Sequence, residues 1–324
     1  MPFRQIPLRK RHLRRICAAV IAITMEQLPL PVAGQFEILA SLEIAEMPDG
    51  CKAVFRKGSS QRVLPGDVMG FFDQYERFYM SSTVGAGAHR LNSRYEAIIA
   101  RNAAVLKGKR VLDIASHDGR WAFAALKAGA LHVTGVEARQ ELIDNALSNF
   151  AHYGIHDGFT FCQGDIFDHL RGQKCDFDVV MCLGFFYHTI RHAELLDLIE
   201  RTGAKWVIID TMVTHLSEER TVSADNPRIG RQNPYGIHLM LDPVDNPAMA
   251  CSDSLARNGS TLVGIPSRAA IRFMAKHFGY TVEEFDWPAY FEKAPVARVK
   301  DMLDYDGRQR ETFYLARVFH ERQS

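Results

Sequence analysis

Residues 111–121 read VLDIASHDGRW, and the organisation of the chain can be traced outward from them. The apolar run that begins at Val111 ends at an acid, Asp113. Small and polar residues follow as far as Gly119, and a helix-like run then begins at Arg120. A strand, a tight turn and a helix start leave backbone N–H groups free at the helix N-terminus, where they can bind a ligand.

Strand-like and helix-like segments alternate around this stretch. The expected strands are residues 110–114, 132–136, 159–163, 177–183 and 206–211, and the expected helices between them are 121–128, 140–153 and 193–201. Strands that alternate with helices form a parallel sheet covered on both faces. Ligands bind such sheets outside the carboxyl ends of the strands, so the residues that follow each strand are the candidates for a site.

Acidic residues end or follow four of the five strands. They are Asp113, Glu137, Asp165 and Asp210, whereas the fourth strand is followed by Tyr187 and His188. A carboxylate accepts hydrogen bonds from two neighbouring hydroxyls, which is how an acid holds a ribose in dinucleotide sites. A carboxylate at Asp113 disfavours a pyrophosphate beside it. The residues at these strand ends are therefore the candidates for holding a ligand.

The order of these residues resembles that of the class I S-adenosylmethionine-dependent methyltransferases, over roughly residues 90–320. The resemblance implies an α/β, Rossmann-like fold with a seven-stranded, mostly parallel sheet, helices on both faces and an antiparallel C-terminal strand. An expected helix at 267–278 and expected strands at 280–287 and 310–319 fit the end of such a sheet. The resemblance also implies S-adenosyl-L-methionine as the cofactor.

Each cofactor-binding role of the family is carried over by position. The acid after the first strand and the turn behind it would hold the methionine part, the next acid the ribose hydroxyls, and the third acid the adenine amino group. The matching residues are Asp113, Ala115, Ser116, His117, Gly119 and Trp121 for the methionine part, Glu137 and Ala138 for the ribose, Gly164, Asp165 and Ile166 for the adenine, and Cys182 and Leu183 as lining after the fourth strand.

The turn departs from the family pattern. The usual turn is D-x-G-x-G-x-G, and this chain reads D-I-A-S-H-D-G, so that only Gly119 keeps its glycine. One interpretation is an altered pocket for another cofactor; the favoured one is that His117 and Trp121 pack on the methionine part. Histidine is among the residues that tolerate a positive φ. A nicotinamide-binding enzyme is the rival, but the turn lacks G-x-G-x-x-G.

The expected catalytic residues are His188 and Tyr187. Methyl transfer from a sulfonium needs a positioned nucleophile, and a hydroxyl nucleophile also needs a base of near-neutral pKa, which histidine provides. His188 follows the fourth strand, beside the expected methyl position, and Tyr187 would orient a partner. A pocket contact or a structural role for His188 remains an alternative. Asp210 lacks the following Asn of the metal-dependent members, so no metal site is predicted.

The domain boundaries are read from composition. Residues 1–33 are expected to form a disordered extension, 34–92 an accessory β/helical region, and 93–324 the methyltransferase domain. Residues 214–263 are polar and irregular and are predicted to form a lid over the pocket. Its hydrogen-bonding candidates are Arg228, Arg231, Asn233, Tyr235 and His238.

Charge and cysteine content restrict the partners. Residues 1–25 contain six basic residues and no acid, so the rest of the chain holds 33 basic against 38 acidic residues. This acidic body argues against a nucleic acid partner. The apolar run at 16–25 is too short to cross a membrane, and the six cysteines form no CxxC pair. We expect a cytoplasmic protein with free thiols that acts on a small-molecule methyl acceptor and is compatible with a homodimer. An upstream start codon, with Met25 as the true start, would explain residues 1–24, and a targeting segment is the alternative.

Three functions remain open. The favoured one is methylation of a small polar molecule, with O-methylation of a sugar or another secondary metabolite first. The Tyr187-His188 pair also resembles the tRNA wobble-uridine carboxymethyl transferases. A module that binds the cofactor without catalysis would fit the altered turn.

Overall fold

The computed structural model describes residues 42–46, 52–56, 69–81, 87–172, 176–215, 236–243 and 256–318. The chain divides into two compact units, residues 1–68 and 69–324. In the first unit, β1 (Leu42–Glu46) pairs with β2 (Lys52–Arg56) in an antiparallel sheet. These strands lie within the β element predicted for the accessory region. The predicted extension, residues 1–33, lies outside the described residues.

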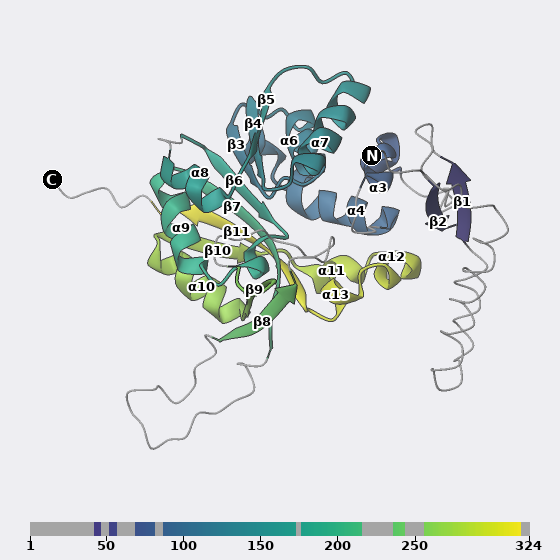
Figure 1. Cartoon of the computed structure of the whole chain (residues 1–324). Coiled ribbons are helices and arrows are strands. Elements are labelled where there is room, and N and C mark those ends of the chain that lie inside the picture. The colour runs from purple at the N-terminus through teal and green to yellow at the C-terminus, as the bar shows by residue number, and fades with distance from the viewer. Residues whose placement is uncertain are drawn as a thin grey trace, which may run out of the picture. The chain divides into compact units, whose positions relative to one another are not determined.

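The second unit is built on a seven-stranded sheet (Figure 1). Its strands, in spatial order, are β10 (Tyr280–Glu284), β11 (Arg310–Arg317), β7 (Trp206–Met212), β6 (Val179–Leu183), β3 (Arg110–Ile114), β4 (His132–Glu137) and β5 (Phe159–Gln163). The pairs from β7 to β5 are parallel, and β11 is antiparallel to both of its neighbours. The predicted Rossmann-like class I methyltransferase sheet, with its antiparallel C-terminal strand, is confirmed.

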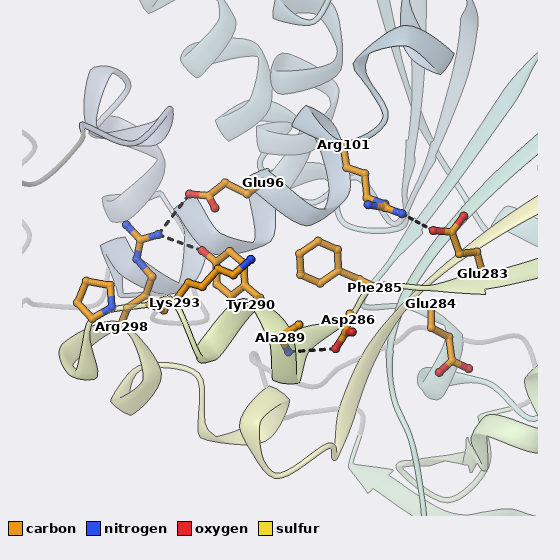
Figure 2. Close-up of a pocket in the computed structure, with 12 residues that line it drawn as sticks. Glu96, Arg101, Glu283, Glu284, Phe285, Asp286, Ala289, Tyr290, Lys293 and Arg298 are labelled. Atoms are coloured by element: carbon orange, nitrogen blue, oxygen red, sulfur yellow. Dashed lines mark hydrogen bonds and ion pairs between the residues drawn. The ribbon is translucent and has the colours of Figure 1, made fainter.

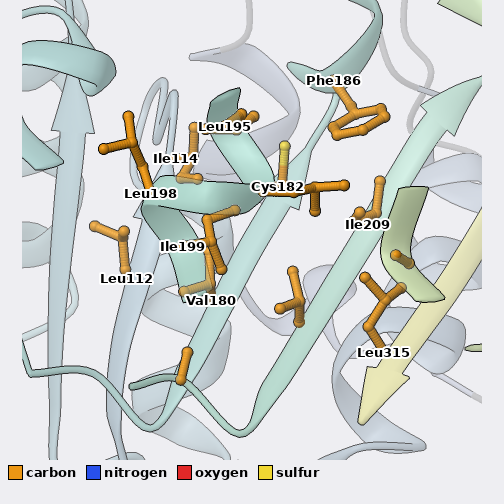
Figure 3. Close-up of a cluster of buried hydrophobic side chains, with 14 of the residues drawn as sticks. Leu112, Ile114, Val180, Cys182, Phe186, Leu195, Leu198, Ile199, Ile209 and Leu315 are labelled. Carbon is orange, nitrogen blue, oxygen red and sulfur yellow. The ribbon is translucent and has the colours of Figure 1, made fainter. Parts of the chain in front are cut away.

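Helices cover both faces of this sheet, as predicted, because its strands are apolar on both sides. Alternate residues such as Leu112, Val180 and Ile209 face one core, with α8 (Ile166–Gly172), α9 (His192–Arg201) and α10 (Arg268–His277) packed on it. Figure 3 shows part of this core, with Leu195, Leu198 and Ile199 of α9 against Leu112 and Val180. Each fully buried side chain of this size stabilises the fold by about 1.5–3 kcal/mol.

The intervening residues face a second core, which is rich in aromatic side chains. Val111, Val179 and Ile208 contact it from the sheet. The helical segments on this side are η1 (Phe72–Gln74), α3 (Arg77–Met80), α4 (Ala88–Tyr95), η2 (Glu96–Ala100), α5 (Ala103–Leu106), α6 (Arg120–Lys127) and α7 (Gln140–His152). Phe72 and Phe78 are fully buried in the same cluster as Trp121, so residues of the predicted accessory region pack into the core of the second unit.

The helical run from α4 to α5 is interrupted. It begins at Ala88, and η2 is a π-helical stretch between α4 and α5. The buried Tyr314 hydroxyl donates to the Ala97 carbonyl at 2.7 Å, and the Asn102 amide donates to the Ile98 carbonyl at 2.9 Å. These side chains satisfy carbonyls that the regular ladder would otherwise use, which accounts for the irregular stretch.

The strand predicted at 280–287 ends early, because β10 stops at Glu284. The Asp286 carboxylate accepts from the Ala289 backbone N–H at 3.0 Å and caps α11 (Trp287–Phe291), which has a proline in its first turn. The sequence reasoning missed this helix and the two that follow it. They are α12 (Val296–Lys300) and α13 (Leu303–Asp306).

Two strands lie within or beside the predicted lid. β8 (Ile237–Pro243) pairs antiparallel with β9 (Ser260–Pro266) to form a hairpin. The expectation of an irregular segment is therefore wrong for β8, whose IHLML run is strand-forming. Residues 216–235 and 244–255 lie outside the described residues, and with them the candidates Arg228, Arg231, Asn233 and Tyr235. Within the described part of the chain, no helix is long and apolar enough to span a membrane.

Candidate active site

The turn between β3 and α6 has the backbone of a glycine-rich turn without most of its glycines. Ala115, His117 and Gly119 have φ values of 53°, 52° and 75°. These are the three positions at which the family pattern has glycine. Gly119 must be a glycine for a second reason, since a Cβ there would lie 2.9 Å from the Ala146 side chain of α7. The chain therefore keeps the turn and accepts two strained residues in it.

Ala115→Gly is expected to raise the free energy of unfolding by about 0.5–1 kcal/mol. Leaving the left-handed region relieves about 1–2 kcal/mol for a residue with a Cβ, while the loss of one half-buried methyl costs about 0.8 kcal/mol. Urea unfolding measures the change. Ala122→Gly, within α6, is the control and should destabilise by about 1 kcal/mol or more. Equal destabilisation by both variants would contradict the strained turn.

Asp113 presents a buried carboxylate to this turn. The residue is 1% exposed, and its Oδ2 atom has no hydrogen-bond partner among the described residues. Burial raises the pKa of Asp113 to about 8; the Ala122 backbone N–H offsets this in part, and the charges of Glu137 and Asp118 add to the rise. An acid in this state gains from a cationic ligand, because a positive charge beside it stabilises the ionised form.

Asp118 and Arg120 form a buried ion pair at the end of the turn. The Asp118 carboxylate accepts two hydrogen bonds of 2.7 Å from the Arg120 guanidinium and one of 2.6 Å from the Ser81 hydroxyl. Burial acts to raise the pKa of Asp118, but Arg120 and His117 outweigh it and hold that pKa well below its usual range. The sequence reasoning missed this pair, although an acid and a base two residues apart in a turn could have suggested it.

The Glu137 carboxylate, at the end of β4, is held in place by backbone groups. Its Oε2 and Oε1 atoms accept from the N–H groups of His117 and Arg139, each at 3.1 Å. A carboxylate has about four acceptor positions, so both oxygens can accept further hydrogen bonds. The turn after β3 thus orients the acid after β4.

The third predicted loop lies next to the second. The Gly164 N–H donates to the Glu137 carbonyl at 3.0 Å, and the Asp165 Oδ1 atom accepts from the Phe167 N–H at 2.7 Å at the start of α8. Because β5, β4, β3 and β6 are adjacent and parallel, the predicted cofactor residues gather at one edge of the sheet. These include Ala138, Ile166, Cys182 and Leu183.

Several of the predicted cofactor residues are also core residues. Ile166, Cys182 and Leu183 belong to the two hydrophobic cores. Trp121 is 5% exposed, lies edge-on to Phe72 at 5.7 Å and has the Arg94 guanidinium 4.9 Å from its ring. Burial of this kind explains their residue types without a ligand. Their contact with the cofactor stays a prediction.

Ser116 is the exception, because its polar atom is buried without an apparent structural use. The residue is 1% exposed, and its Oγ atom has no hydrogen-bond partner in the described parts of the chain. It fits only because residue 135 on β4 is glycine: a Cβ there would lie 2.7 Å from that oxygen. Asp113 and Ser116 thus each have a buried oxygen without a hydrogen-bond partner among the described residues, which makes the turn a candidate place for a polar ligand.

His188 lies in η3 (Phe186–His188), just after β6. Its ring lies 4.1 Å from the Tyr187 ring, and its Nδ1 atom lies 3.2 Å from the Asp242 carboxylate of β8. Burial lowers the pKa of His188, Asp242 acts in the opposite direction, and Arg310 and Arg139 add to the lowering. The sequence reasoning missed Asp242; its position 54 residues downstream gave no signal. His238, on the same strand, is exposed.

Asp210 is the centre of a buried ionic network. Its carboxylate accepts from Arg310 at 2.6 and 2.7 Å, from Arg94 at 3.1 Å, from the Tyr305 hydroxyl at 2.7 Å and from the Thr312 hydroxyl at 3.0 Å. Burial acts to raise the pKa of Asp210, but the two arginines and Tyr305 hold it well below its usual range. These donors occupy the acceptor positions a metal would need, so we assign Asp210 a structural role.

A pocket of about 540 Å³ lies elsewhere in the second unit (Figure 2). It is lined by residues of η2, the end of β10, α11 and α12, and none of them is a predicted site residue. Glu96 pairs with Arg298, and Arg101 pairs with Glu283, across this pocket. Its charged side chains thus support the fold locally, and we assign it no ligand.

The comparisons with known proteins agree with this geometry. The family model of a methyltransferase domain matches residues 111–204, which run from β3 to the loop before β7. This part of the chain is a class I methyltransferase domain. The class is that of the S-adenosylmethionine-dependent methyltransferases.

Among curated proteins, the chain is similar to the probable protein arginine N-methyltransferase 1.2 of Arabidopsis thaliana. The identity is 29% over 139 residues, which is 43% of this chain and 37% of that protein. Protein arginine N-methyltransferase 1.1 of the same plant is 28% identical over 139 residues and 34% of its length. The chain thus matches only about a third of the length of these curated relatives.

Among solved structures, two neighbours illustrate the similarity. The N-terminal domain of EvdMO1, in the presence of S-adenosylhomocysteine and D-fucose, has a TM-score of 0.48 at 17% identity, over 74% of this chain and 85% of that one. The complex of DhpI with S-adenosylhomocysteine has a TM-score of 0.46 at 15% identity, over 76% of this chain and 95% of that one.

Proposed function

We propose that the protein transfers a methyl group from S-adenosyl-L-methionine to a hydroxyl of a small polar acceptor. The observation that supports this cofactor is the pair of buried oxygens without hydrogen-bond partners, Asp113 Oδ2 and Ser116 Oγ, at the turn to which the family resemblance assigns the methionine part. Asp113 would hold the ammonium, and Glu137 the ribose hydroxyls. When bound, the cofactor supplies a methyl group on a positively charged sulfur.

The acceptor class is inferred from His188. The imidazole is buried, and its lowered pKa keeps it neutral near pH 7, so it can take a proton from a hydroxyl. Tyr187 lies beside it and would orient the acceptor. A small acceptor is favoured over a nucleic acid, since Arg310, which lies beside Tyr187, is neutralised by Asp210. A homodimer and a cytoplasmic location stay predictions.

Calorimetry with S-adenosylhomocysteine tests the cofactor. We expect one site per chain and at least a tenfold loss of affinity for Glu137→Gln, because an amide offers fewer acceptor positions to the ribose hydroxyls. Glu141→Gln is the matched control, since Glu141 is exposed on the neighbouring helix α7. Binding of NADH without binding of S-adenosylhomocysteine would contradict the proposal.

The acceptor is tested by radiolabelled methyl transfer to three classes: a panel of glycosides and phenols, total tRNA, and an arginine-rich peptide. Incorporation into the first class alone supports a small hydroxyl acceptor. Incorporation into tRNA or the peptide would overturn it. Cofactor binding with no incorporation into any of them would favour a binding module without catalysis.

A further inference from the structure

The contact between His188 and Asp242 joins two segments far apart in the sequence. The His188 Nδ1 and Asp242 Oδ2 atoms lie 3.2 Å apart, and the two side chains are 11% and 7% exposed. We propose that Asp242 is a positioning residue that fixes His188 with its proton on Nδ1 and leaves Nε2 free to accept the proton of the acceptor hydroxyl. This inference rests on the proposed function, because it deepens the role of His188.

The tautomer follows from the chemistry of the two groups. An ionised carboxylate only accepts hydrogen bonds, so Nδ1 must be the donor in this contact. A neutral imidazole carries one ring proton, which leaves Nε2 as the bare nitrogen. When the hydroxyl O–H bond breaks, its proton forms an Nε2–H bond, and the resulting imidazolium lies beside the Asp242 carboxylate. Asp242 thereby selects the useful tautomer and stabilises the charged product of the proton transfer.

The surroundings of His188 contain opposing charges. Asp242 of β8 attracts a proton to the ring, whereas Arg310 of β11 and Arg139 after β4 repel it. Tyr187 lies next to His188, with the Arg310 guanidinium 5.5 Å from the Tyr187 ring centre. The burial and the two arginines keep the resting imidazole neutral, and the single carboxylate decides which nitrogen carries the proton.

The hairpin that carries Asp242 is fixed to the domain at several points. The His192 Nε2 atom at the start of α9 lies 3.0 Å from the Gly264 carbonyl of β9, and the Thr214 N–H, which follows β7, donates to the Pro266 carbonyl of β9 at 3.1 Å. Gly264 is required there, because a Cβ would lie 3.0 Å from the His192 ring. Asp242 itself is opposite the buried Thr261. Such anchoring gives the carboxylate a defined position relative to η3.

The tautomer can be measured without knowing the acceptor. In ¹⁵N-histidine-labelled full-length protein, long-range ¹H–¹⁵N spectra report the protonated nitrogen and the pKa of each ring, and His188→Gln identifies the signals of His188. We expect Nδ1–H in the wild type. In Asp242→Asn the amide can donate to Nδ1, so we expect a change to Nε2–H and a fall in the His188 pKa by about one unit.

Asp197→Asn, which removes a partly exposed acid from α9, is the control and should leave both readouts unchanged. The same tautomer in the wild type and Asp242→Asn would overturn the proposal. If Asp242→Asn does not fold, Asp242→Ala replaces it, with the fall in the His188 pKa as the expected result and an unchanged pKa as the contradiction. Calorimetry with S-adenosylhomocysteine on the same samples is the separate test of the proposed function. If the wild type does not bind it, the proposed function is wrong, whereas the tautomer of His188 tests only the role of Asp242.

Discussion

Asp113→Asn is expected to weaken the binding of S-adenosylhomocysteine by about 100-fold or more and, at the same time, to stabilise the free protein at pH 8. The two effects have one cause. Asp113 is a buried carboxylate whose Oδ2 atom has no partner in the described part of the structure. A buried charge without a partner destabilises the free fold, and a cationic ligand removes that penalty when it binds. Asparagine avoids the penalty and loses the attraction.

The pH dependence of the free protein has a definite sign. The pKa of Asp113 is raised to about 8 in the fold, against about 4 in the unfolded chain, so the folded state binds more protons between these values. The contribution of Asp113 to the free energy of unfolding therefore falls as the pH rises from about 4 to about 8, by up to about 1.4 kcal/mol per pH unit. Urea unfolding at pH 6 and pH 8 should show this fall in the wild type and a smaller one in Asp113→Asn.

Ligand affinity should change in the opposite direction. Since a cationic ligand favours ionised Asp113, binding below pH 8 releases a proton, and the affinity of the wild type should rise nearly tenfold per pH unit between pH 6 and pH 7.5. In Asp113→Asn the affinity should vary little with pH. Asp157→Asn, at an exposed acid, is the control and should behave as the wild type. A pH-independent affinity of the wild type would refute the assignment of the ammonium to Asp113.

The sequence predicted the sheet because its strands are apolar runs that end in acids. Val111 and Val179 serve one core and Leu112 and Val180 the other, so each strand is apolar on both faces and cannot be mistaken for an exposed hairpin. The turn was also predictable in outline. The positive φ values of Ala115 and His117 were less predictable. The only indication was that the family pattern has glycine at these positions, because neither residue type requires a positive φ.

The partners of the site residues could not be predicted, because they come from elements far away in sequence. Asp242 reaches His188 from β8, and Arg94 and Arg310 reach Asp210 from α4 and β11. Sequence reasoning places an acid at a strand end but cannot tell whether a ligand or an arginine will neutralise it. Asp210 shows the second outcome, because two arginines neutralise it, and the binding that we propose for Asp113 would be the first. The two acids differ in the number of side chains that donate hydrogen bonds to each carboxylate, and this number is known only from the folded structure.

Asp210→Asn is expected to lower the free energy of unfolding by about 3–5 kcal/mol, because it leaves two buried arginines without their counter-ion. Arg310 and Arg94 are 8% and 11% exposed in their side chains, so water cannot replace the carboxylate. Asp210 has a lowered pKa, so its contribution is present above about pH 4 and is lost as the pH falls further. Urea unfolding at pH 7 and at about pH 3 measures both effects.

The matched control is Asp304→Asn, which removes a bidentate partner of Arg90 at a more exposed position. The side chains of Arg90 and Asp304 are 20% and 30% exposed, and solvent screening should limit the loss to about 1 kcal/mol.

A second variant isolates the cause: Asp210→Asn combined with Arg310→Met leaves one uncompensated cation fewer and should be less destabilised than Asp210→Asn alone. Equal losses for Asp210→Asn and Asp304→Asn would mean that the buried network does not support the fold. If the double variant is less stable than Asp210→Asn alone, Arg310 stabilises the fold mainly through packing. The apolar part of its side chain would then contribute more to the free energy of unfolding than its ion pair does.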